Sequence, residues 1–138
     1  MARNHRNGRF TKATTLSELA RACLATDHRD GALSAAEEAV TVARHQDGRV
    51  NECFALLTRA QTLRATGRTV DADDDLGAAL ALARQTGAAS YEPLIHEELG
   101  RLRKHETVLR EALRLYRHIG ATGHARRLEA ELPMEASR

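Results

Sequence analysis

The chain repeats part of its own sequence: residues 25–48 read ATDHRDGALSAAEEAVTVARHQDG, and residues 65–88 read ATGRTVDADDDLGAALALARQTGA. A third stretch, residues 111–121, matches residues 78–88 at six of eleven positions with a shift of 33 residues. Repeats of this length are typical of helical arrays, in which each unit buries its apolar face against the next. The first two stretches align without a gap at a shift of 40 residues, with six identities: Ala25/Ala65, Thr26/Thr66, Ala32/Ala72, Ala39/Ala79, Ala43/Ala83 and Arg44/Arg84.

Apolar residues recur at helical spacing through each repeat, so we expect two helices in each of three units. Residues that commonly begin or end helices set the expected boundaries. The expected helices are residues 16–26, 31–45, 49–66, 70–86, 91–103 and 106–119, followed by a short helix that ends at Pro133. We therefore predict an all-α fold of three antiparallel helix pairs with a short C-terminal capping helix.

Particular residues are expected to cap these helices. Thr15-Leu-Ser-Glu18 has the capping-box pattern, in which a hydroxyl accepts a hydrogen bond from a free backbone N–H and the glutamate reaches back. Asp30 and Ser90 are the expected N-caps of the second and fifth helices. Gly67 is expected to adopt the left-handed conformation after the third helix.

The composition also favours helices over strands. Apolar residues make up 42% of the chain but aromatic residues only 3%, and tryptophan is absent. The β-branched and aromatic residues on which sandwiches and barrels depend are scarce. No run of about 18 apolar residues exists, so no membrane span is expected, and the N-terminus lacks the apolar segment of a secretory signal. We expect a cytoplasmic protein.

Charge and repeats together divide the chain into three parts. Residues 1–12 hold four basic residues and no acid, although the whole chain has a net charge of only +2. We expect residues 1–13 to be a disordered basic arm, residues 14–133 to be the helical domain and residues 134–138 to be a tail. A role for the arm in binding nucleic acid stays open as an alternative, but it is disfavoured because no second basic cluster stands beside it.

Cys23 and Cys53 are expected to remain unpaired. The first lies near the end of one expected helix and the second near the start of another. If these two helices stack in parallel, about ten residues of axial offset separate the thiols, which is on the order of 15 Å. A disulfide requires Cα atoms within about 7 Å of each other.

Small residues at fixed places in successive helix pairs resemble the tetratricopeptide repeat. The residues that carry this resemblance are Ala20, Ala60 and Gly100 in the first helix of each unit, Ala32, Ala39, Ala72 and Ala79 in the second helices, and Gly67 at a turn. The resemblance implies a right-handed superhelix of three antiparallel helix pairs. It also implies that the first helices line a concave face that binds a protein or a peptide.

The C-terminal stretch is similar to part of another family. Residues 111–132, EALRLYRHIGATGHARRLEAEL, resemble the tail of large actinobacterial regulators of the LuxR and cyclase-linked ATP-binding types, in which a helical array follows an ATPase domain. This resemblance implies an alternative function, as a sensor or dimerisation fragment of an ATP-dependent transcriptional regulator. The chain has no GxxxxGK motif followed by Ser or Thr, so we expect it to bind no nucleotide cofactor.

Candidate catalytic motifs in the sequence are incomplete. His96-Glu97 begins like the zinc motif HExxH, but Gly100 occupies the position that needs the second histidine. The acidic run of residues 71–75 resembles a calcium loop, but position twelve, which should be glutamate, is Leu82. No nucleophile–histidine signature is present. We expect no enzyme activity and no metal.

The expected binding surface is the concave face. Four basic side chains on that face would flank an apolar centre. Arginine binds carboxylates through two parallel hydrogen bonds, so we expect a protein or peptide partner that presents acidic groups. Self-association is also expected, because three repeats are near the minimum for stability. The residues expected on this face are Ser17, Arg21 and Leu24 in the first unit, Phe54, Leu57, Gln61 and Arg64 in the second, and Leu94, Glu97, Arg101 and Lys104 in the third.

Overall fold

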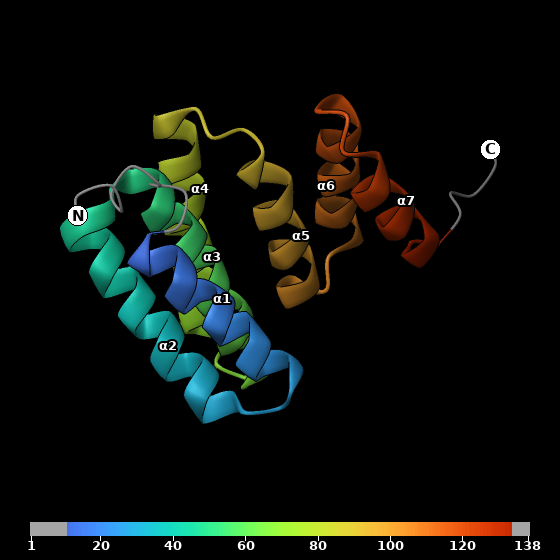
Figure 1. The fold of residues 1–138 in the computed structure, drawn as a ribbon. Helices are drawn as coiled ribbons and strands as arrows, with labels where there is room; N and C mark the ends of the chain where they lie inside the picture. Colours follow the sequence, from blue (N-terminus) through green and yellow to red (C-terminus); the bar gives the residue numbers. More distant parts are fainter. Residues whose placement is uncertain (1–10, 134–138) are drawn as a thin grey trace, which may run out of the picture.

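A computed structural model of the chain describes residues 11–133. Within this range the chain is all-helical and contains no strand, which confirms the prediction that the fold is all-α. A five-residue π-helix, Ala43–Asp47, continues the second α-helix. The α-helices of the described range are α1 (Lys12–Ala25), α2 (Arg29–Val42), α3 (Arg49–Ala65), α4 (Thr69–Thr86), α5 (Tyr91–Arg103), α6 (Glu106–His118) and α7 (Thr122–Glu131) (Figure 1).

The helices follow one another across the molecule in chain order, from α1 and α2 at one end to α6 and α7 at the other (Figure 1). The closest pairs are α1 with α2, α3 with α4, and α5 with α6. Helix α3 also packs against α1 and α5, so these three odd-numbered helices are direct neighbours. Helix α7 packs mainly on α6.

Six of the eight alanines that the first two repeats share lie where helices meet. Their side chains are at most 1% exposed, and the equivalent residue of the third unit, Ala112, is fully buried; Ala25 is exposed and Ala65 is half-buried. Small side chains at these positions let neighbouring helices approach closely, which explains why most identical residues of the two repeats are alanines. The buried repeat alanines are Ala32, Ala39 and Ala43 in the first unit and Ala72, Ala79 and Ala83 in the second.

The two larger apolar clusters stabilise different parts of the array. The larger cluster joins α1 to α5 through buried side chains such as Leu56, Leu76 and Ile95. The smaller one joins α6 to α7 around Tyr116 and Leu128. No helix of residues 11–133 is both long and apolar enough to cross a bilayer.

Both cysteines are free thiols, as predicted. Cys53 is buried in the larger cluster, where its Sγ donates a hydrogen bond to the carbonyl oxygen of Ala79 at 3.3 Å. Burial raises the pKa of the Cys53 thiol to about 11, and the nearby Glu52 carboxylate adds to the effect. The thiol is therefore protonated at neutral pH and has a packing role.

Several helices end in the same way, with a residue of positive φ followed by a backbone N–H that donates to a carbonyl five residues earlier. At the end of α3, Gly67 has a φ of 82° and the N–H of Arg68 donates to the oxygen of Leu63 at 2.9 Å, as the sequence predicted. At the end of α5 the positive-φ residue is Lys104, whose φ is 54°. A side chain with a Cβ is strained in this conformation.

Replacing Lys104 by glycine is expected to raise the free energy of unfolding by about 1 kcal/mol, because glycine adopts positive φ without the Cβ clash. Urea unfolding followed by circular dichroism measures the change. Lys104→Ala is the matched control, since it removes the same charge but keeps the Cβ. An equal stabilisation by both variants would show that the charge of Lys104, and not its backbone strain, is responsible.

The predicted start of the first helix is wrong by about one turn. Helix α1 begins at Lys12, and its N-cap is Thr11, whose Oγ1 accepts a hydrogen bond from the N–H of Thr14 at 3.1 Å. Thr15 therefore lies inside the helix and does not form the expected capping box. Of the residues expected in the basic arm, Thr11 is this N-cap and residues 12 and 13 belong to α1, whereas residues 1–10 and the expected tail (134–138) lie outside the described residues.

Two other predicted caps also differ from the structure. Helix α2 begins at Arg29, so Asp30 lies in its first turn, where a carboxylate favours the helix dipole without capping. Ser90 is the N-cap residue of α5, but its side chain makes no capping hydrogen bond. Its backbone already has helical angles, with φ of −67° and ψ of −19°, whereas a capping side chain normally needs an extended backbone.

Candidate functional site

A groove of about 290 Å³ lies between α1, α3 and α5. The last two turns of α1 and the last two turns of α3 form its sides. Its residues are spaced three or four apart within α1 and within α3, so each set lies on one helix face. The residues that line the groove are Arg21, Leu24 and Ala25 from α1, Gln61 and Arg64 from α3, and Glu98 from α5.

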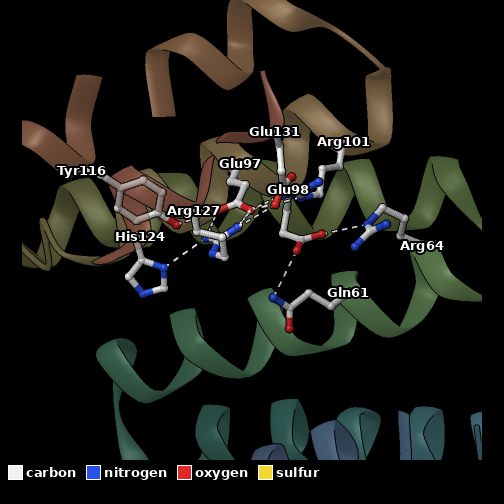
Figure 2. Close-up of polar contacts among 9 residues, drawn as sticks. All are labelled: Gln61, Arg64, Glu97, Glu98, Arg101, Tyr116, His124, Arg127 and Glu131. Carbon is white, nitrogen blue, oxygen red and sulfur yellow. Dashed lines mark hydrogen bonds and ion pairs between the residues drawn. The ribbon is translucent and has the colours of Figure 1, made fainter. Parts of the chain in front are cut away.

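Glu98 connects two helices at the edge of the groove. Its Oε1 accepts a hydrogen bond from Nε of Arg64 at 2.8 Å, and its Oε2 accepts one from Nε2 of Gln61 at 3.3 Å (Figure 2). The Glu98 side chain is only 10% exposed, so this ion pair is partly shielded from water. The contact ties α3 to α5 and neutralises the charge of Arg64.

Arg21 is the groove's other cation, and it has a different environment. Its guanidinium carbon lies 6.0 Å from the centre of the Phe54 ring, and the Phe54 ring stacks on Tyr91 with 6.0 Å between ring centres. Arg21 is exposed and forms no ion pair within residues 11–133. A cation, a phenyl ring and a phenol ring thus form a stack that crosses α1, α3 and α5.

The structure brings together five of the residues predicted for the binding face: Arg21, Leu24, Gln61 and Arg64 line the groove, and Phe54 lies against Arg21. Other predicted residues do not reach it. Ser17 and Leu57 are buried and so cannot meet a partner. Leu94 packs against both apolar clusters, and Lys104 is the C-cap of α5. Of the apolar side chains expected at the centre of the face, Leu57 is therefore excluded, and Leu24 and Ala25 supply the apolar surface of the groove.

Glu97 and Arg101 belong to a separate cluster that holds α7 in place. The Glu97 carboxylate is 7% exposed and accepts hydrogen bonds from Arg101, Arg127 and the hydroxyl of Tyr116 at 2.6–3.1 Å (Figure 2). Arg101 and Arg127 also form ion pairs with Glu131 of α7. Glu97, which the sequence placed on the binding face, is thus a buried residue that stabilises the fold.

The pKa of Glu97 reflects two opposing effects. Burial alone would raise the pKa, but the hydrogen bonds from Arg127, Arg101 and Tyr116 together outweigh it and lower the pKa to about 2. Burial and the hydrogen bond to Glu97 raise the pKa of Tyr116. Its hydroxyl therefore stays protonated and donates to the carboxylate at neutral pH.

The four basic side chains predicted for the binding face do not share one groove. Arg64 and Arg101 are each paired with carboxylates of α5 or α7. Lys104 lies at the end of α5 and does not line the groove. Of the four, Arg21 is the cation that lines the groove without a carboxylate partner among residues 11–133.

Glu98 was not among the residues predicted for the site. The spacing of 40 residues pointed to Glu97, which is its neighbour in sequence. The equivalent residues of the first two units, Ser17 and Leu57, are buried as well, so this position faces the interior in every unit. One residue along a helix rotates the side chain by about 100°, which brings Glu98 to the groove. The sequence feature that could have indicated Glu98 is its position next to Glu97, but periodicity alone does not show which of the two glutamates lines the groove.

The acidic run of residues 71–75 forms ion pairs within the fold. Asp71 pairs with Arg68, Asp73 with Arg103 and Asp75 with Arg59, each at 2.8 Å. Among the described residues, no group of three or more His, Cys, Asp or Glu side chains is placed to hold a metal ion. The groove between α1, α3 and α5 combines apolar side chains with Arg21, which has no carboxylate partner in the described part of the chain.

Comparisons of the chain with protein-family models, with curated proteins and with solved structures find no match. The groove geometry is therefore the basis on which a function can be assigned.

Proposed function

We propose that the chain is a non-enzymatic helical-repeat module of the cytoplasm that binds a peptide, or a segment of another protein, in the groove between α1, α3 and α5. The observation that carries this proposal is the environment of Arg21. Its charge is not neutralised within residues 11–133, and it lies beside the half-buried Leu24 at a hollow of about 290 Å³. A cation next to apolar surface in a concave site is a common arrangement for binding a carboxylate-bearing segment.

The architecture that we propose is a right-handed superhelix of three antiparallel helix pairs, similar to tetratricopeptide repeats, with α7 as the terminal cap. Packing in chain order and the buried small residues at a spacing of 40 support it. The additional contacts of α3 with α1 and α5 also support it, because the first helices of successive repeats are neighbours in such an array. In this arrangement the groove lies on the concave face.

Replacing Arg21 by alanine is expected to weaken binding of groove ligands about tenfold, because a charge-assisted hydrogen bond to an exposed arginine is lost. The ligands would be peptides selected from a random library displayed on phage against the full chain, with affinities measured by fluorescence polarisation. Arg114→Ala is the matched control, since Arg114 is an exposed arginine of α6 that pairs with Glu111 away from the groove.

The control variant should bind the selected peptides as tightly as the parent chain. Equal affinities for all three proteins would show that the peptides bind elsewhere and would overturn the groove assignment. Circular dichroism of each variant should be unchanged, because Arg21 is exposed and contributes to no helix cap.

A further inference from the structure

The groove contains three side chains that can donate hydrogen bonds to an anion: Arg21, Gln61 and Arg64. Two of these three already donate to the chain's own Glu98, one to each carboxylate oxygen. Glu98 thus occupies the position that a partner's carboxylate would need in order to bind Arg64 and Gln61. The donor that stays available is Arg21.

Displacing Glu98 would be unfavourable. Its side chain is only 10% exposed, so a partner carboxylate that took Arg64 would leave a mostly buried charge without its cation. No comparable penalty applies at Arg21, where an incoming carboxylate replaces water. The guanidinium carbon of Arg21 lies 6.0 Å from the centre of the Phe54 ring, and no carboxylate of residues 11–133 pairs with its N–H groups.

The size of the groove limits what can accompany the carboxylate. Its volume of about 290 Å³ is at the lower end of the range for small-molecule sites, about 300–1,000 Å³. Leu24 and Ala25 give the α1 side an apolar surface next to Arg21. The space therefore suits one apolar side chain adjacent to one carboxylate.

We infer that the groove binds a peptide that presents a single carboxylate next to an apolar side chain, with Arg21 as the anion-binding residue and Glu98 as an internal carboxylate that excludes a second one. This inference rests on the proposed function of the groove and defines the chemistry of its partner. Polyacidic segments gain no advantage, because Glu98 already holds the second cation.

Titrations of the full chain with three small probes test the inference. N-acetyl-leucine carries one carboxylate beside an apolar side chain, N-acetyl-leucinamide carries none, and N-acetyl-aspartyl-leucine carries two. The Nε–Hε resonances of the arginines, observed by ¹⁵N NMR, report which guanidinium group each probe contacts. In the parent chain, N-acetyl-leucine should shift the resonance of Arg21 but not that of Arg64, and N-acetyl-leucinamide should shift neither. N-acetyl-leucine and N-acetyl-aspartyl-leucine should bind with equal affinity.

The Glu98→Gln variant should release Arg64. In this variant the two-carboxylate probe should shift both Arg21 and Arg64 and bind about fivefold more tightly than it binds the parent. Glu92→Gln is the matched control, because Glu92 is an α5 glutamate that pairs with Arg84 and does not line the groove. Its probe affinities should equal those of the parent.

The possible outcomes separate this inference from the proposed function. Equal binding of N-acetyl-leucinamide and N-acetyl-leucine, or a shift of Arg64 in the parent chain, would overturn the inference. The proposed function would still stand if library-selected peptides lost affinity in Arg21→Ala. If the Glu98→Gln variant did not fold, the parent chain alone would still test the inference. Tighter binding of N-acetyl-aspartyl-leucine than of N-acetyl-leucine to the parent chain would contradict the exclusion of a second carboxylate by Glu98.

Discussion

Replacing Glu97 by glutamine is expected to lower the free energy of unfolding by about 3 kcal/mol at neutral pH. The carboxylate is buried and holds Arg101 of α5, Tyr116 of α6 and Arg127 of α7. Its pKa of about 2, against an ordinary value of 4.5, means that the folded chain strongly favours its charged form. Glutamine can still accept hydrogen bonds, so the variant removes the charge and keeps the side-chain volume.

The effect should be largest at α7. Within this short helix only Ala125 and Leu128 are buried, so its attachment depends on the ion pairs around Glu97. Hydrogen exchange should therefore speed up in α7 of the variant more than in α3, whose buried residues belong to the larger cluster. Uniform acceleration along the chain would contradict a local role for the Glu97 cluster.

The stabilisation by Glu97 should disappear in acid. Because its pKa is lower in the folded chain than in the unfolded chain, Glu97 stabilises the fold fully above about pH 4.5, and this contribution is lost as the pH falls towards about 2. The unfolding free energies of the parent and Glu97→Gln should differ at neutral pH and converge near pH 2. Urea unfolding at a series of pH values measures this convergence.

Two other variants serve as comparisons for Glu97→Gln. One removes a hydrogen bond of the Glu97 cluster, and the other removes a surface carboxylate outside the cluster. Tyr116→Phe removes one hydrogen bond to Glu97 and should cost about 1 kcal/mol. Glu111→Gln removes a carboxylate that pairs with Arg114 on the surface of α6, and it should change stability by less than about 0.5 kcal/mol. If Glu97→Gln proved no more destabilising than Glu111→Gln, the cluster would not hold α7.

The helices could be predicted from the sequence because their contacts are local and repeated. Alanines at a spacing of 40 mark the helix contacts, and Gly67 marks a turn that needs positive φ. The helix starts were harder to predict, because several neighbouring residues can cap. Thr11 and Thr15 both have a suitable hydroxyl, and local sequence does not decide which of them begins α1.

The charge of the site could not be predicted in the same way. The pairs Arg64–Glu98 and Arg127–Glu97 join residues 34 and 30 positions apart on different helices. Whether two such side chains meet depends on the rotation of each helix about its axis, and a difference of one residue is enough to exchange partners. Periodicity therefore identified Arg21, Gln61 and Arg64 as neighbours but could not show that Glu98 neutralises one of them.

Gly100 has a different structural role from the glycines at helix ends, because it lies in the interior of α5 where α6 crosses closely. A Cβ added to Gly100 would lie 2.6 Å from Cγ and 3.0 Å from the backbone nitrogen of Leu109. Neither atom is the free end of a flexible side chain, so one helix would have to shift. Gly77 in the interior of α4 is a suitable comparison, because a Cβ added there would have no atom of a neighbouring helix within 4 Å.

Gly100→Ala is therefore expected to lower the free energy of unfolding by about 1–3 kcal/mol through overpacking. Gly77→Ala should raise it by about 1 kcal/mol, because alanine favours the helix and meets no neighbour. Urea unfolding of the two variants measures both changes. Combining Gly100→Ala with Leu109→Ala should restore part of the loss, since the shortened side chain makes room for the new methyl group. A Gly100→Ala variant as stable as Gly77→Ala would mean that α5 and α6 are not in close contact, and the small residue at this position would then have no packing role.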